Sequence, residues 1–476
     1  MNAARANVWV VTIAAATLVG CASVPREAGF PDVERIVSER TTHRVRWDRG
    51  SPSDTAVAEA VRGLLQKELT ADEALQISLL NNRSLQATYE DLMVAQADLV
   101  AAGLLNNPVF DAEIRIHEAG GGTGAELALM QDFIDLLYIP MRRKIAGSAF
   151  EAAKLRVAGR VIDLGGEVRA AFYTLQSSQQ LLEMRQQVVA ATAASYEVAK
   201  RLRAAGNNTE LDLANEQALY EQSRLELRAA ESQVVQDRER LNRLMGLWGP
   251  DAASWSISNR LPEAPQDVAI AEGLERTAVE RSLDLAAARR DVEAASRSMG
   301  LAAPIGLLPE AEVGASAEHE AEGGWAVGPA FSLPIPLFNQ GQPAIASARA
   351  ELRRARQEYH ALAVRVRSRT RAARDAAIAA HDQAEHYRKV VLPLRNKIVE
   401  QTQLQYNAMQ IGPFQLLDAK QRQIDAGVAY VRALRAYWLA RVDLDQLLSG
   451  RMPAGETSLG AEPSFTPAPA GGGGGH

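Results

Sequence analysis

A long stretch without proline limits the possible folds of this chain more than any other feature of its sequence. No proline occurs between Pro140 and Pro250, so a helix that begins near Ile145 can run to Ala205, turn, and return from Thr209 to Met245. Apolar residues recur at seven-residue steps on both arms: Val161, Val168, Leu175, Leu182, Val189 and Tyr196, then Leu213, Tyr220, Leu227, Val234 and Leu241. This spacing predicts an antiparallel coiled-coil hairpin whose outward arm is roughly 90 Å long.

The second half of the chain follows the order of elements expected in the first half. A helix over residues 70–104 is matched by one over 274–303, and each precedes two strands, a long helix and a return helix. The second long helix has its own seven-residue series, with a kink expected at Pro393. The series consists of Leu352, Tyr359, Val366, Ala373, Ala380, Tyr387 and Leu394. The sequence therefore predicts two tandem repeats.

The two helix tips align at one offset, which pairs Gly206 with Gly412 and Asp212 with Asp418. Both aspartates are therefore expected in matching places just inside the two return helices. Before the first repeat, prolines and glycines over residues 22–67 predict an extended linker with one short helix near 56–65.

Two pairs of segments alternate between apolar and charged residues, which is typical of β-strands with two different faces. They cover residues 110–116 and 125–134, and then 310–318 and 325–333. We expect Phe110, Ile114, Trp325 and Phe331 to face lipid, and Asp111, Glu113, Glu310 and Glu312 to face a lumen. A soluble sheet shows the same alternation, so the pattern alone leaves both interpretations open.

Four strands of about ten residues cannot close a membrane barrel, because the smallest barrels need eight and open edges are not tolerated in lipid. Strands that cross a membrane would therefore have to be pooled by several copies of the chain. Three copies would supply twelve strands.

The single cysteine, Cys21, follows an apolar segment from Val8 to Val19 that is too short to span a membrane. Leu18-Val19-Gly20-Cys21 resembles the bacterial lipobox, in which the peptide is cut before a cysteine that then carries lipid. Ala22 and Ser23 follow in place of the aspartate that favours inner-membrane retention, so we expect a lipid anchor at Cys21 and sorting to the outer membrane. The net charge of -6 gives no support for nucleic-acid binding.

Taken together, these features resemble the TolC-like outer membrane factors, the exit ducts of tripartite efflux pumps and type I secretion. The resemblance covers residues 66–450 and is carried best by residues 69–75, by Gly328-Pro329 with 334–338, and by 412–418. It implies a mainly α fold with a membrane β-barrel portion, in a homotrimeric duct built from two helix, hairpin and long-helix repeats per chain. The domains are then a signal peptide (1–20), a lipidated segment (21–67), two duct repeats (68–248 and 269–450) joined by an equatorial linker (249–268), and a disordered tail (451–476).

The resemblance also implies a function: an outer membrane channel that passively conducts substrate from an inner-membrane pump, of the RND type, and a periplasmic adaptor. The adaptor would contact the tips at Gly206, Asn207, Asn208, Gly412 and Pro413. Asp418 falls on the first acidic position of the family's periplasmic gate, with Asp212 beside it, while Gln421 departs from the next acidic position. A role for Asp418 as a first-turn aspartate that interacts with the helix dipole is the alternative.

The cargo and the competing functions rest on weaker patterns. Residues 336–342 resemble the heavy-metal branch of the family, and an acidic cluster suits cations. That cluster consists of Glu310, Glu312, Glu318, His319, Glu320 and Glu322. A drug-efflux or type I secretion duct and a structural periplasmic coiled-coil lipoprotein are the alternatives. We expect no enzyme activity and no cofactor, because residues 120–124 lack a phosphate-binding lysine and His381 and His386 lack zinc-protease spacing.

Overall fold

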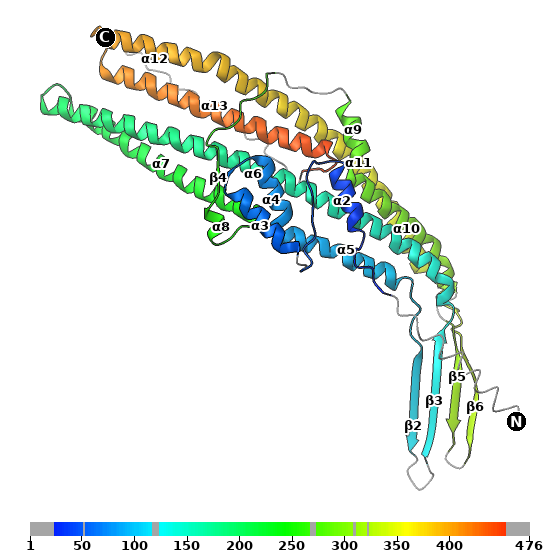
Figure 1. Cartoon of the computed structure of the whole chain (residues 1–476). Helices are drawn as coiled ribbons and strands as arrows, with labels where there is room; N and C mark the ends of the chain where they lie inside the picture. Colours follow the sequence, from blue (N-terminus) through cyan, green and yellow to red (C-terminus); the bar gives the residue numbers. More distant parts are fainter. Residues whose placement is uncertain are drawn as a thin grey trace. The chain divides into compact units, whose positions relative to one another are not determined.

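The computed structural model describes residues 23–50, 53–116, 123–266, 273–307, 311–320 and 323–453, and these are mainly helical (Figure 1). The chain divides into two compact units. The first comprises Met1–Glu39, Ser84–Ala158 and Leu283–Val364, and the second comprises Arg40–Arg83, Gly159–Ser282 and Arg365–His476. Among the described residues, no helix is both long and apolar enough to cross a membrane.

The first unit contains an antiparallel sheet in the order β2-β3-β5-β6 (Figure 1). Its strands are β2 (Val109–Ile116), β3 (Thr123–Asp132), β5 (Glu312–His319) and β6 (Trp325–Ser332). The unit also contains helices α2 (Phe30–Ser38), α5 (Arg83–Ala101) and α10 (Leu283–Leu307), and the first parts of α6 (Asp135–Ala204) and α11 (Gln342–His386). All four expected strands are present, each within two residues of the alternating segment that predicted it.

The second unit contains the helical hairpins. Its elements are α3 (Ser53–Leu65), α4 (Ala71–Asn81), the rest of α6, α7 (Glu210–Met245), α8 (Pro250–Ala253), α9 (Leu274–Arg281), the rest of α11, the π-helical turn η1 (Tyr387–Val391), α12 (Leu392–Asn407) and α13 (Pro413–Leu448). Two short strands, β1 (Glu68–Leu69) and β4 (Ser256–Ile257), pair in parallel. The expected capping box of α4 is present, because Thr70 accepts from the Glu73 amide and Glu73 accepts from the Thr70 amide.

A buried carboxylate of α6 binds the segment that follows α13. The Asp163 side chain is only 3% exposed, and Arg451 Nε donates to both of its oxygens at 2.9 Å. Gln446 Nε2 donates to the same carboxylate at 3.0 Å. Because Gly166 has no Cβ, the Gln446 amide can approach α6 closely enough to do so.

Several helix boundaries differ from the sequence-based expectation. The helix expected over 70–104 is broken at Asn82, and the helix expected over 274–303 is broken at Ser282. Asn82 leaves the helix because its side-chain amide donates to Leu244 O at 2.8 Å, while Asn81 donates to Gly246 O at 2.8 Å. These two side chains therefore satisfy carbonyls at the end of α7, which the hydrophobic periodicity could not reveal.

Two further boundaries were wrong for different reasons. Helix α6 begins at Asp135 and continues through Pro140, because one proline removes one backbone hydrogen bond without necessarily ending a long helix. Helix α2 lies where an extended linker was expected. Tertiary contacts hold it: the rings of Phe30 and Tyr89 are 5.1 Å apart, and Lys154 Nζ of α6 lies 2.6 Å from Asp32.

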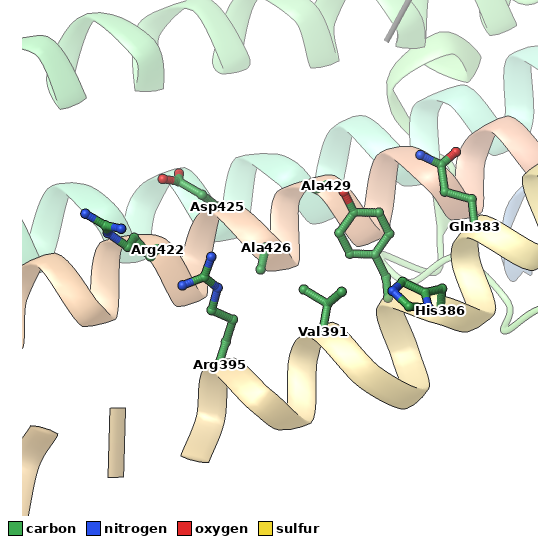
Figure 2. A pocket seen from close by; sticks show the side chains of 9 residues that line it. Gln383, His386, Val391, Arg395, Arg422, Asp425, Ala426 and Ala429 are labelled. Atoms are coloured by element: carbon green, nitrogen blue, oxygen red, sulfur yellow. The ribbon is translucent and has the colours of Figure 1, made fainter. Parts of the chain in front are cut away.

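Near Pro393, where a kink was expected, the helix contains the π-helical turn η1. In this turn the Leu392 amide donates to Tyr387 O, five residues back. One extra residue in a turn shifts the following side chains by roughly 100° around the helix. Leu394, expected in the seven-residue seam, is 55% exposed as a result. Arg395 points toward α13 instead (Figure 2).

Candidate functional site: the sheet faces and the helix tips

The strand register fixes which side chains share a face of the sheet. Phe110 pairs with Leu129, Leu129 with Ala315 and Ala315 with Pro329, so alternate residues of all four strands follow this row. Phe110, Ile114, Trp325 and Phe331 therefore lie on one face, and each is more than half exposed. Asp111, Glu113 and Glu312 lie on the other face, while Glu310 lies outside the described residues.

Three glutamates form a row across the polar face. Glu113 pairs with Glu126, and Glu126 pairs with Glu318, so three like charges stand directly opposite one another. Such an arrangement is unfavourable unless a cation relieves it. Arg115 does so, because its guanidinium lies 2.9 Å from Glu113, 2.9 Å from Glu126 and 3.9 Å from Glu318. The sequence interpretation missed Glu126 and this role of Arg115.

His319 does not belong to the acidic face. It pairs with Ala125 and Trp325 on the apolar side, and its ring lies 5.3 Å from that of Trp325. His319 is therefore not part of the acidic cluster expected from the sequence, and Glu322 of that cluster lies outside the described residues.

The first tip joins α6 to α7 through Gly206, Asn207 and Asn208. Gly206 has a φ of 76°, which favours glycine, and the Asn207 amide donates to Leu202 O at 2.9 Å. Thr209 then begins α7 as its N-cap, and its hydroxyl donates to Asp212 at 2.6 Å. This hydroxyl, together with the Thr209 amide, lowers the pKa of Asp212 below its ordinary value. Asp212 is therefore part of a capping box.

The second tip is built differently. Met409, with a φ of 58°, takes the left-handed position, and Gly412 is an extended N-cap followed by Pro413. In conformation Gly412 corresponds to Thr209, so the residue matching Asp212 is Gln415. The expectation that Asp212 and Asp418 occupy matching places is thus wrong. The offset from the aligned glycines fails because Gly206 ends one helix, whereas Gly412 begins the next.

Asp418 lies six residues into α13, beyond the first turn, so the helix-dipole interpretation of this residue is also wrong. Its carboxylate lies 2.9 Å from Arg422, one turn later. Gln421 donates to Asp425 at 3.1 Å on the same stretch. These pairs place both predicted gate residues in an exposed polar surface on α13.

A groove of about 690 Å³ lies between α13 and the helix that contains η1 (Figure 2). Arg395 and His386 line one side, and Arg422 and Asp425 line the other. Ala426 and Ala429 are too small to fill the space that the exposed Leu394 leaves. The groove thus lies beside the π-helical turn, with Tyr387 and Val391 of that turn among its lining residues.

Cys21, the expected lipid attachment site, lies outside the described residues. Within the described ranges, no group of three or more His, Cys, Asp or Glu side chains is arranged to hold a metal ion.

The structure thus combines long helical hairpins with a small antiparallel sheet that has two different faces. Residues 74–247 match the family model described as outer membrane efflux protein. The chain is homologous to CzcC and TtgC, and its fold is similar to that of solved TolC-like channels, as the sequence resemblance predicted.

Individual proteins support this relationship. The chain is 22% identical to the cobalt-zinc-cadmium resistance protein CzcC of Cupriavidus metallidurans, over 80% of this chain and 90% of CzcC. It is 23% identical to TtgC, a probable efflux pump outer membrane protein of Pseudomonas putida, over 70% of this chain and 72% of TtgC. The crystal structure of the Campylobacter jejuni CmeC outer membrane channel has a TM-score of 0.68 at 16% identity, with 82% of this chain and 87% of CmeC covered. Of these relatives, TtgC is described as an efflux pump outer membrane protein and CmeC as an outer membrane channel.

Proposed function

We propose that the chain is the outer membrane channel of a tripartite efflux system and conducts substrate passively from a periplasmic adaptor and an inner-membrane pump to the exterior. The sheet is the observation that carries this proposal. It has one exposed apolar face and one charged face, and among the residues that the structure describes β2 and β6 each pair with a single neighbour. Lipid would cover the first face and water would fill the space along the second.

The open edges favour a homotrimer. A four-stranded sheet in lipid needs partners for both edge strands, and three copies would close a barrel of twelve strands. In this arrangement residues 68–248 and 269–450 act as two duct repeats around the linker 249–268. Extraction from outer membranes should yield a heat-modifiable trimer, whereas a structural tether would become a soluble rod once its lipid is removed.

Heavy-metal cations are the cargo that we favour, because CzcC is named for resistance to cobalt, zinc and cadmium. The carboxylates of Asp111 and Glu312 on the face that also bears Glu113 would attract cations to a lumen, whereas Glu113 itself is already paired with Arg115. The similarity to TtgC leaves drug efflux as the second candidate. An RND-type pump would supply the energy and most of the selectivity.

The tips provide the contacts for the adaptor. Gly206, Asn207, Gly412 and Pro413 are exposed or half-exposed, which leaves them accessible to a partner. Asp418 would narrow the periplasmic mouth, with Gln421 reducing the negative charge at the next level. Asp212 contributes less to such a gate, because its carboxylate is already engaged by Thr209.

The anchor at Cys21 would hold the amino-terminal segment at the inner leaflet of the outer membrane, while the helices extend into the periplasm. Labelling with a palmitate analogue should be lost in Cys21→Ser. Persistent labelling in that variant would end the proposal of lipid attachment at this residue.

The central experiment measures zinc tolerance and channel activity together. A strain that lacks its own channel gene should regain zinc tolerance when this chain is expressed, and the purified protein should give discrete conductance steps in a planar bilayer. Drug tolerance without zinc tolerance would favour the second cargo. A protein with neither conductance nor complementation would refute the channel function.

A further inference from the structure

The helices of the first unit follow the order of the strands that they join. The chain next to α5 packs on α6, since a Cβ at Gly103 would lie 3.1 Å from Arg143. Arg156 of α6 binds Asp291 of α10 at 2.5 Å, and Gly306 of α10 lies against Gly341 at the start of α11. The order α5-α6-α10-α11 therefore matches β2-β3-β5-β6. Helices α5 and α11 are the outer members, as β2 and β6 are the edge strands.

Helix α5 has an uncovered acidic face. Leu85, Tyr89 and Leu92 are buried on the side toward the unit. On the opposite side Asp91 and Asp98 are exposed and Val94 is 62% exposed. Within the described part of the chain, neither aspartate has an ion-pair partner.

Helix α11 has an uncovered basic face. Ala348 and Leu352 are buried, whereas Arg349, Arg353 and Arg356 are exposed. None of these three arginines has an ion-pair partner among the residues that the structure describes. One chain thus carries unpaired cations on one outer helix and unpaired anions on the other.

The two faces match in spacing as well as in charge. Asp91 and Asp98 are seven residues apart, and so are Arg349 and Arg356, which corresponds to about 10 Å along each helix. Helix α5 runs toward β2, and α11 runs away from β6. When β6 of one copy lies antiparallel to β2 of the next, these two helices are antiparallel as well. Arg349 then meets Asp98 where Arg356 meets Asp91, with Val94 opposite Arg353.

We propose that α11 of one copy packs against α5 of a second copy through the ion pairs Arg349 with Asp98 and Arg356 with Asp91. This surface deepens the proposed function and rests on it, because it continues the β6 to β2 edge pairing into the helices. The contact joins two different faces, so it repeats head to tail, as the subunits of the proposed trimeric ring require. A second copy is favoured over another partner because both halves of the match occur in this chain, beside its two open strand edges.

The test is a charge-reversal rescue on the purified full chain. Arg349→Asp with Arg356→Asp, and separately Asp91→Arg with Asp98→Arg, should each lower the fraction of trimer in detergent by roughly tenfold, because attraction becomes repulsion. The variant that carries all four substitutions should recover the trimer, since each pair is restored with its signs exchanged. Native mass spectrometry measures the fraction directly.

Glu351→Arg is the matched control, because Glu351 is exposed on the opposite side of α11 and also has its charge reversed. It should leave the trimer fraction unchanged. Failure of the four-fold variant to recover the trimer, or equal losses in the control, would overturn the proposed contact. A wild-type protein that is not a trimer would instead refute the proposed function, so the two failures are distinguishable.

Discussion

Arg451 should stabilise the end of α13 by neutralising Asp163, and Arg451→Leu tests this while preserving much of the side-chain packing. Removing one partner of a buried ion pair costs about 3–5 kcal/mol. The lower value of about 3 kcal/mol applies here, because Gln446 still donates to Asp163 and Arg160 remains 3.7 Å away. A loss of this size would accelerate amide exchange at the end of α13 on the order of 100-fold.

Hydrogen exchange with mass spectrometry can measure this effect in detergent. The relevant amides are those of Ser449, Gly450 and Arg451, which donate to carbonyls of residues 445–447. Asp163→Asn in the Arg451→Leu background should recover most of the protection, because the buried charge is gone. Arg432→Leu, an exposed change on the same helix, is the matched control. Exchange within a few-fold of wild type in Arg451→Leu would refute the electrostatic explanation, as would a double variant without rescue.

Three further predictions concern other parts of the chain. Ile114→Arg should destabilise the membrane-inserted protein by about 2–4 kcal/mol per chain, whereas Glu113→Arg should mainly change conductance, and equal yields of folded trimer from both variants would contradict the assignment of faces. Hydrogen bonds from Arg388 and then Lys389 hold the pKa of Glu385 at about 2, below its ordinary 4.5, so this carboxylate stabilises the fold fully above pH 4.5 and loses its effect as pH falls through 2. The difference in unfolding temperature between wild type and Glu385→Gln should therefore be constant above pH 5 and shrink below 4.5, and a difference that grows on acidification would be inconsistent. Asp418→Ala should weaken the block of conductance by divalent cations added from the periplasmic side, and an unchanged block would remove Asp418 from the gate.

The elements that local pattern determines were predictable from the sequence. The α6 to α7 hairpin follows from heptad spacing, and the shared faces of Phe110 with Ile114 and of Asp111 with Glu113 follow from the two-residue period of a strand. The capping box at Thr70 is likewise encoded within four adjacent residues. In each case the determining contacts lie close together in the sequence.

Features that depend on distant contacts were not predictable in this way. Asn82 ends a helix because its side-chain amide donates a hydrogen bond to a carbonyl of α7, more than 160 residues later in the sequence. Arg115 reaches Glu318 only because β3 pairs with β5, a pairing that no local pattern specifies. The helix tips illustrate a third limit: two glycines can align in sequence while one ends a helix and the other begins one. Residue identity alone did not reveal which role each glycine has.

The π-helical turn η1 also has a consequence for how sequences of this kind should be aligned. A helix that contains such a turn has one residue more than an α-helix of the same length. The turn therefore marks a position where a single residue can be gained or lost without interrupting the helix. Relatives that lack this residue would still present to α13 the residue that aligns with Arg395, because the turn takes up the extra residue. A one-residue gap in an alignment of this region therefore belongs within Tyr387–Val391, so that aligned residues on both sides of the gap keep the same facing toward α13.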